Sequence, residues 1–88
     1  MEKVKIDCKK IKTKEALHSI IARKMDFDKY YGNNLDALWD ELTQLKEFRI
    51  SLINSKYLKI NLGEYGQKIL ELFEDLQKEN DAYKIGLY

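Results

Sequence analysis

The sequence predicts an α/β domain in which a three-stranded parallel sheet is covered by helices. Three segments have the residue patterns of strands, and the segments between them carry apolar residues at helical spacing. Strands that alternate with helices are joined by crossovers, so they pair in parallel, and the crossovers are expected to be right-handed. A chain of 88 residues has room for one domain, residues 1–88, and one small core, because folding at this size buries about 60–65% of its surface.

Periodicity predicts the first strand and the first helix. Residues 3–8 alternate polar and apolar side chains, which is the pattern of a half-buried strand. Thr13 can cap the helix that follows, and Glu15 lies in its first turn, where the helix dipole favours an anion. This helix is predicted over residues 14–24 from a stripe at i, i+3, i+4 and i+7, which consists of Leu17, Ile20, Ile21 and Lys24.

A turn-rich loop separates this helix from a second one. Residues 26–34 contain Gly32, which allows a positive φ, and Asn33 and Asn34, either of which can cap the next helix. That helix is predicted to run for about ten residues, because leucines recur at i, i+3 and i+7 as Leu35, Leu38 and Leu42.

The second half of the chain predicts a central strand and a long helix. Residues 48–54 form a mostly apolar run that is typical of a central strand. Residues 56–63 suit either a short helix or an irregular strand, and Gly63 and Gly66 are expected to interrupt the chain there. The clearest helical stripe, over residues 67–79, consists of Ile69, Leu72, Phe73 and Leu76.

The last predicted features are a helix end and a strand. Asn80 is predicted to end the long helix as a left-handed C-cap. Tyr83, Ile85 and Leu87 then alternate with other residues as the final strand.

Composition excludes several classes of protein. Apolar residues make up 44%, and 16 basic residues nearly balance 15 acidic ones, which argues against disorder and against a general nucleic-acid binder held by a basic surface. One cysteine, Cys8, excludes an internal disulfide and a zinc site built on several thiolates. Residues 1–25 carry no apolar run that would act as a signal peptide, and no stretch could span a membrane, so a cytoplasmic protein is expected.

The charges are unevenly distributed along the chain. Residues 1–25 sum to +5, residues 26–47 sum to −4, and residues 48–88 are balanced. The acidic segment holds the second helix, where an exposed stripe beside the leucines consists of Asp36, Asp40 and Thr43. Like charges one turn apart destabilise a helix, and the aromatic residues Trp39, Tyr30 and Tyr31 lie beside this edge. Acids and aromatics together are typical of a protein interface.

Residues 30–43, which read YYGNNLDALWDELT, resemble the signature of the barstar family, the intracellular inhibitors of barnase-type ribonucleases. The run is long and contains low-frequency residues. The Leu17-His18 pair in the first helix and residues 70–73 in the last helix also fit the family. The resemblance spans nearly the whole chain, with about two residues fewer between the second strand and the last helix.

The resemblance implies a three-stranded parallel sheet covered by helices, no catalysis, no cofactor and no metal. Asp40 would enter the phosphate-binding pocket of the nuclease, Asp36 would pair with a neighbouring base, and Tyr30 would cover the catalytic histidine. The other implied contacts are Tyr31, Gly32, Asn34, Leu35, Trp39 and Thr43, with Asp75 at the edge of the interface. We expect a free monomer that forms a 1:1 complex burying roughly 800 Å² per side, with no direct contact to nucleic acid or membrane.

Three departures from the family pattern bear on the partner. Glu41 and Gln44 replace smaller residues, and Asp75 is one methylene shorter than the usual glutamate. The family's better-known member is strongly acidic, whereas this chain is near neutral, so long-range attraction to a basic nuclease should be weaker. These departures leave open an alternative function, a barstar-like binding or immunity module for a different toxin or a non-nuclease partner.

Other interpretations of the same residues carry less weight. His18 and Cys8 are expected to be packed core residues, and the N-terminal lysines are expected to form a solvated face. A hydrolase or metal site built on Asp36 and Asp40 would need further ligands or a lid, and none is visible in the sequence.

Overall fold

The structure is a computed structural model that describes residues 3–88, so the first two residues of the expected domain lie outside the description. The three strands form one sheet in the order β1-β2-β3, and both neighbouring pairs are parallel, which confirms the predicted α/β class. The elements are β1 (Lys3–Asp7), the 3-10 turn η1 (Cys8–Lys10), α1 (Lys14–Met25), α2 (Leu35–Thr43), β2 (Phe48–Ile53), α3 (Lys56–Leu62), α4 (Glu64–Glu79) and β3 (Tyr83–Leu87).

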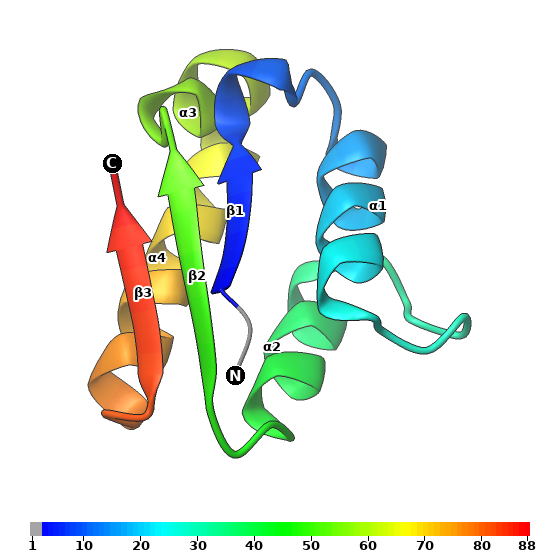
Figure 1. The fold of residues 1–88 in the computed structure, drawn as a ribbon. Helices are drawn as coiled ribbons and strands as arrows, with labels where there is room; N and C mark the ends of the chain where they lie inside the picture. The colour runs from blue at the N-terminus through cyan, green and yellow to red at the C-terminus, as the bar shows by residue number, and fades with distance from the viewer. Residues whose placement is uncertain (1–2) are drawn as a thin grey trace.

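The helices pack on one face of the sheet, and the core lies between the two layers. Figure 1 shows the strands in front and α4 behind β2 and β3, so the connections between successive strands are right-handed crossovers. Each layer contributes fully buried side chains, which include Ile6, Leu17, Ile21, Leu38, Leu42, Ile50, Leu52, Leu58, Ile69, Phe73 and Leu76. The apolar stripes predicted from periodicity therefore meet in a single core.

Two helix N-termini are capped as the sequence predicts. The Thr13 hydroxyl accepts a hydrogen bond from the Ala16 N–H at 3.0 Å, and the Asn34 side-chain oxygen accepts one from the Ala37 N–H at 2.8 Å. Each cap satisfies a backbone donor that the first helical turn leaves free. The ambiguous segment after β2 is the short helix α3, and α1 ends one residue later than predicted.

One prediction about a turn residue is wrong, and one glycine does not use its conformational freedom. Gly32 is free to take a positive φ but does not; the left-handed residue of the loop is Asn33, with φ of 55°. The prediction of a left-handed Asn80 is wrong. Asn80 is extended (φ −154°, ψ 121°) and not left-handed, because its side-chain oxygen instead accepts a hydrogen bond from the Ala82 N–H at 2.8 Å. Both turns therefore depend on an asparagine: Asn33 takes the left-handed conformation, and Asn80 stabilises the turn through its side chain.

The first strand is one residue shorter than predicted. It ends at Asp7, whose carboxylate accepts hydrogen bonds from Asn54 Nδ2 and from the Lys9 N–H, and these bonds lower the pKa of Asp7. Cys8 therefore lies in η1 and not in β1. Its thiol is fully buried, and burial raises the pKa of Cys8 to about 11, so the thiol stays protonated and packs as a small apolar group.

Gly66 does not interrupt the chain as predicted, since it lies inside α4 and is buried. A Cβ atom at this position would collide with the backbone carbonyl of Leu58 in α3. The break between the two helices falls instead at Gly63, which has a φ of 60°. The absence of a side chain at Gly66 therefore sets how closely α3 and α4 cross.

Gly66→Ala is expected to destabilise the domain by about 1–3 kcal/mol, the usual cost of overpacking. Helix propensity alone predicts the opposite sign, a gain of about 1 kcal/mol. Urea unfolding of the variant measures the difference, and Gln77→Ala, at an exposed position of the same helix, is the control. An increase in the stability of Gly66→Ala would contradict the close helix crossing.

Candidate protein-binding site

The loop before α2 is held by its own polar groups. The Asp28 carboxylate accepts a hydrogen bond from the Tyr30 N–H at 2.8 Å, and the Asp28 carbonyl accepts one from the Tyr31 N–H at 3.0 Å. These bonds form a tight turn that sends two adjacent tyrosines in different directions. Tyr30 is 82% exposed, whereas Tyr31 is 7% exposed. Tyr30 therefore presents its ring to solvent and Tyr31 does not.

A buried histidine connects this loop to the helical layer. His18 in α1 is 1% exposed, and its two ring nitrogens lie 2.6 Å from the hydroxyls of Tyr31 and Tyr65. Tyr65 belongs to α4, so the imidazole joins three segments that are distant in sequence. We call this group, Tyr31, His18 and Tyr65, the histidine clamp.

The clamp suits a neutral imidazole. One ring nitrogen then donates to one tyrosine hydroxyl, and the other nitrogen accepts from the second hydroxyl. Burial lowers the pKa of His18 from its usual value, and the nearby Glu15 opposes this shift only in part. Burial also raises the pKa values of Tyr31 and Tyr65, so both hydroxyls stay protonated. This confirms the expectation that His18 is a packed core residue.

The exposed edge of α2 carries the acids that the sequence singled out. Leu38 and Leu42 are fully buried, and Asp36 and Asp40 are exposed on another face of the helix. Asp36 lies in the first turn, where the helix dipole favours it, and Asp40 stands one turn farther along. Thr43 is half-buried, and its hydroxyl donates to the Trp39 carbonyl of its own helix at 2.8 Å.

A groove runs between α2 and α4. It has a volume of about 280 Å³ and is lined by Leu35, Asp36 and Trp39 from α2 and by Lys68, Glu71, Leu72 and Asp75 from α4. The half-buried Leu35 and Trp39 give it apolar walls, and three of its four charged residues are acidic. The structure thus brings Asp75 beside the α2 residues with which the sequence grouped it.

Gly32 packs closely against the start of α2. A Cβ atom there would lie 3.2 Å from the Ala37 Cβ, which is tighter than most Cβ contacts, so Ala37 would have to shift slightly. Asn34 caps α2 and also donates from Nδ2 to the Gly32 carbonyl at 3.3 Å. Gly32 and Asn34 are both exposed, so they set the path of the loop and remain open to a partner.

The other end of α2 is tied to the sheet. The Tyr83 hydroxyl, from β3, donates to the carbonyl of Leu45 at 2.8 Å, just after the helix. The side chain of Tyr83 also stacks on Phe48, with ring centroids 4.5 Å apart. Because the histidine clamp holds the loop at one end and Tyr83 holds the other, α2 is fixed relative to the core.

One of the expected contact residues is buried. The ring of Tyr31 packs on Phe27, and its hydroxyl is hydrogen-bonded to His18, so Tyr31 positions the loop. Its expected contact with a partner stays a prediction. The remaining expected residues are at least partly accessible and lie on the loop, α2 and α4: Tyr30, Gly32, Asn34, Leu35, Asp36, Trp39, Asp40, Thr43 and Asp75.

Sequence reasoning missed the α4 side of this surface. Lys68, Glu71 and Leu72 line the groove but were not among the expected contacts. Glu71 and Asp75 lie at i and i+4 on the exposed side of α4, the same spacing as the acids of α2. That repeated spacing was the available signal.

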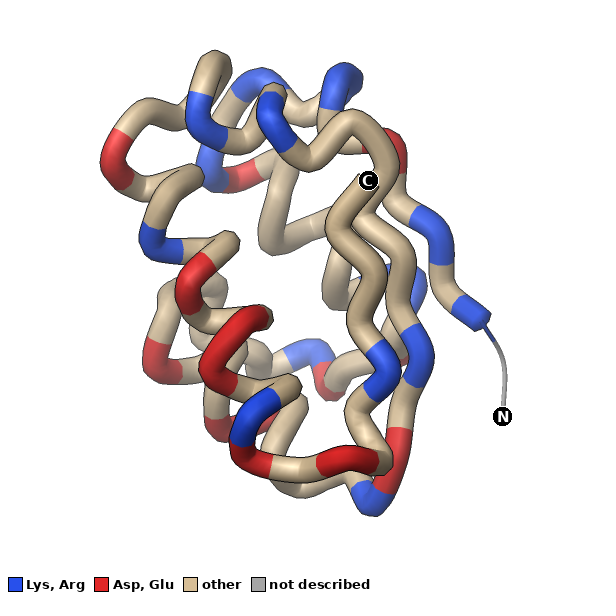
Figure 2. The backbone as a smooth tube through the Cα atoms, turned by 90° about the vertical axis from the view of Figure 1, so that its left-hand side faces the viewer, with Lys and Arg blue, Asp and Glu red and all other residues tan. Residues whose placement is uncertain are grey.

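Acidic residues gather on two of the helices. α2 contains three acidic residues and no base, and α4 contains five acids and two bases, whereas the three strands contain four bases and one acid. Figure 2 shows bases along the strands on one side, and both acids and bases on the helical side. Within residues 3–88, no group of three or more His, Cys, Asp or Glu side chains is arranged to hold a metal ion. The negative charge of the helical side therefore lies on α2 and α4.

The neutral His18 makes stability depend on pH. The unfolded chain binds a proton on this histidine near pH 6.5, and the folded chain binds it only at lower pH. Stability is therefore complete above about pH 6.5 and falls as the pH drops below it, by up to about 1.4 kcal/mol at pH 5.5. Urea unfolding at pH 7.5 and 5.5 measures this loss.

His18→Gln is the matched control for this prediction. The chain contains one histidine, so the variant lacks the side-chain type whose ordinary pKa is near 6.5. We expect it to be less stable than the unmodified chain at pH 7.5 but nearly independent of pH over this interval. Equal pH dependence in the two proteins would contradict the neutral clamp.

Comparisons with known proteins agree with the fold. Among the described residues, no helix has the length and apolar character needed to cross a membrane. The family model described as Barstar (barnase inhibitor) matches residues 1–88. The Bacillus subtilis (strain 168) protein named "Putative ribonuclease inhibitor YrdF" is 39% identical in an 88-residue alignment that covers 97% of each chain. These matches confirm the resemblance of residues 30–43, and the chain belongs to the barstar family.

Proposed function

We propose that this protein inhibits a ribonuclease of the barnase type by covering the nuclease's active site with α2 and the loop before it. The observation that carries the proposal is the exposed edge of α2, where Asp36 and Asp40 stand one turn apart and contribute nothing to the core. Two like charges at this spacing cost the helix a few tenths of a kcal/mol. A cationic partner would neutralise both carboxylates, so the repulsion between them is relieved on binding.

The chemistry of the target explains why carboxylates are used. A ribonuclease that cleaves a phosphodiester must hold cationic side chains around the scissile phosphate. A carboxylate that enters this pocket forms charge-assisted hydrogen bonds with them, of which the bidentate pair with arginine is the strongest. In the proposal Asp40 takes the place of the substrate phosphate and Asp36 pairs with a neighbouring base. RNA is excluded without any catalysis by the inhibitor.

The rigidity of α2 supports this role. Binding costs free energy whenever a flexible segment has to be ordered. Here the Asn34 cap and the Tyr83 hydroxyl hold the two ends of the helix, and the histidine clamp holds the preceding loop. The two aspartates therefore stand at a fixed separation before the nuclease arrives. Most of the binding energy of the new charge pairs then appears as affinity.

Aromatic and apolar side chains around the acids supply the rest of the contact. Tyr30 is 82% exposed beside the helix and is proposed to lie over the catalytic histidine of the nuclease. Trp39 and Leu35 line the groove next to Asp36, and Asp75 closes its far side. Large aromatic residues that surround a desolvated charge are typical of the centre of an interface. We propose a 1:1 complex of about 800 Å² per side.

A second candidate function keeps the surface and changes the partner. Glu41 is half-buried and Gln44 is exposed next to the acidic edge, and both are larger than the residues common in the family. They add bulk and charge where a nuclease would dock. A toxin other than a barnase-type ribonuclease, or a non-nuclease protein with a cationic cleft, would fit the same carboxylates.

Titration of a barnase-type ribonuclease with this protein is expected to stop RNA cleavage at one equivalent. In Asp40→Ala the nuclease's cations lose their main partner, so affinity should fall by about 4 kcal/mol, roughly a thousandfold. The stability of the variant should be unchanged or slightly higher, because Asp40 is exposed and a like charge on α2 is removed. RNA cleavage and urea unfolding measure the two effects.

Glu79→Ala is the matched control, since it removes an exposed acid at the far end of α4. It should inhibit as well as the unmodified chain. Equal loss of inhibition in both variants would contradict a role for Asp40 as the phosphate substitute. No inhibition by the unmodified chain would favour the second candidate function.

A further inference from the structure

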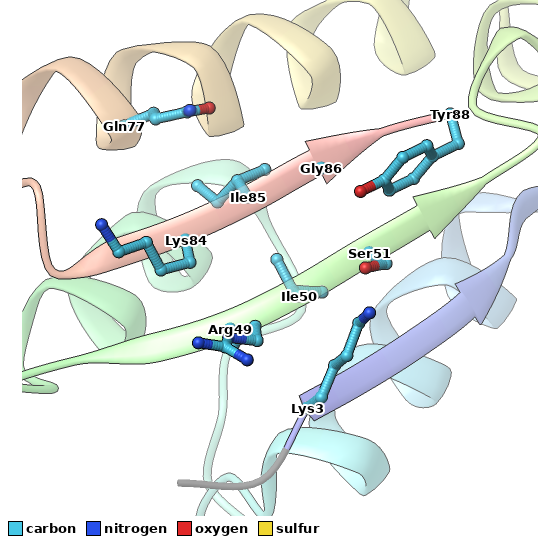
Figure 3. Close-up of a pocket in the computed structure, with 9 residues that line it drawn as sticks. All are labelled: Lys3, Arg49, Ile50, Ser51, Gln77, Lys84, Ile85, Gly86 and Tyr88. Atoms are coloured by element: carbon cyan, nitrogen blue, oxygen red, sulfur yellow. The ribbon is translucent and has the colours of Figure 1, made fainter.

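The sheet face opposite the helices carries a row of three cations. The parallel register places Lys3 beside Arg49 and Arg49 beside Lys84, so each strand contributes one basic residue at the same level. All three are exposed. Neighbouring strands lie about 4.8 Å apart, so the row is roughly 10 Å long. Figure 3 shows the three side chains on adjacent strands with Tyr88 at the other end of the same surface.

This row is unfavourable for folding alone. Like charges directly opposite each other on adjacent strands destabilise a sheet. The next outward row consists of Lys5, Ser51 and Gly86, so it adds another cation and no acid. A solvated face that served only solubility would mix both signs of charge. Folding alone therefore does not account for the row.

The surface is hollow at this point and has an aromatic wall. The pocket has a volume of about 350 Å³ and is lined by all three cations together with Ser51, Gly86 and Tyr88. The hollow is open to solvent, and it is large enough to hold a small anion with a planar group attached.

Tyr88 is placed by the backbone and by a glycine. Its N–H donates to the Leu52 carbonyl at 2.9 Å, and its carbonyl accepts from the Ser55 N–H at 2.8 Å, so both groups continue the sheet beyond β3. The ring lies over Gly86, where a Cβ atom would collide with it. The ring is 70% exposed, so one face is free for stacking.

We propose that this face binds a nucleotide, either free or within a single strand of RNA. The Arg49 guanidinium, at the centre of the row, would grip the phosphate bidentately, with Lys3 and Lys84 on its two sides. The base would stack on Tyr88, as bases stack on aromatic side chains in single-strand binding proteins. The expectation of no contact with nucleic acid rested on the balanced total charge and on the N-terminal lysines, and neither reveals the neighbours that the sheet brings to Lys3.

Titration with adenosine monophosphate at low salt, followed by amide NMR shifts, tests the proposal. We expect saturable shifts around Arg49 and Tyr88. Arg49→Gln should weaken binding at least tenfold, and Lys12→Gln, which removes an exposed cation away from the sheet, should leave it unchanged. Tyr88→Ala should weaken nucleotide binding about fivefold or more but leave the binding of inorganic phosphate unchanged.

An RNA oligoadenylate distinguishes the two sources of the nucleotide. Binding at least tenfold tighter than the monophosphate indicates a strand, and equal affinity indicates a free nucleotide; both support the site. With the strand, Arg49→Gln should also reduce the slope of log affinity against log salt by about 0.7.

Three results would overturn the proposal: no saturable binding of either probe, equal weakening by Arg49→Gln and Lys12→Gln, or no effect of Tyr88→Ala on nucleotide binding. Far-UV circular dichroism of each variant checks that it folds. Ribonuclease inhibition is measured in parallel, because it uses the opposite face and should persist in all three variants whether or not nucleotide binds.

Discussion

The position of α2 depends on a buried imidazole that is shared by two tyrosine hydroxyls. His18 holds Tyr31, and with it the loop, against α1, and it holds Tyr65, and with it α4. Both bonds are short, and the one to Tyr31 is buried, where hydrogen bonds are stronger and broken ones cost more. The other hydrogen bonds of the loop are those of an exposed polar turn, and water competes for their donors and acceptors. The clamp therefore gives the acidic edge of α2 its fixed position relative to the α4 side of the groove.

α2 satisfies two opposing demands with one short sequence. Its nine residues must bury Leu38 and Leu42 to hold the domain together, and they must also expose Asp36 and Asp40. An isolated helix of this length would be marginal in water, so packing and capping have to sustain it. The stability lost to the acidic edge is regained from the core, the Asn34 cap and the Tyr83 tie. Such a compromise between stability and binding is typical of a functional surface.

Periodic and capping signals were sufficient for most of the fold. Thr13 and Asn34 act within one turn of chain, and the leucines of α2 repeat at helical spacing, so local sequence contains the information. Local sequence does not predict a conformation that depends on contact with a distant segment. The pattern predicts a chain break at Gly66, because the Leu58 carbonyl that excludes a side chain there belongs to another helix. The burial of Tyr31 is likewise not visible in local sequence, because its hydrogen-bond partner His18 lies in α1. The row of Lys3, Arg49 and Lys84 exists only through strand register.

The net charge of +1 combines an acidic surface on α2 with a basic surface on the outer face of the sheet. The distance between these two surfaces determines how strongly each one acts on a partner. The molecule measures 31 × 28 × 21 Å, whereas charges in physiological salt are screened over about 8 Å. A basic nuclease that approaches α2 therefore experiences the near acids strongly, and the cations on the far side of the sheet only weakly. The near-neutral net charge therefore reduces the electrostatic attraction of a basic nuclease at long range, but changes it little at close range. For the same reason an anion on the sheet face would leave the acidic edge of α2 almost unchanged.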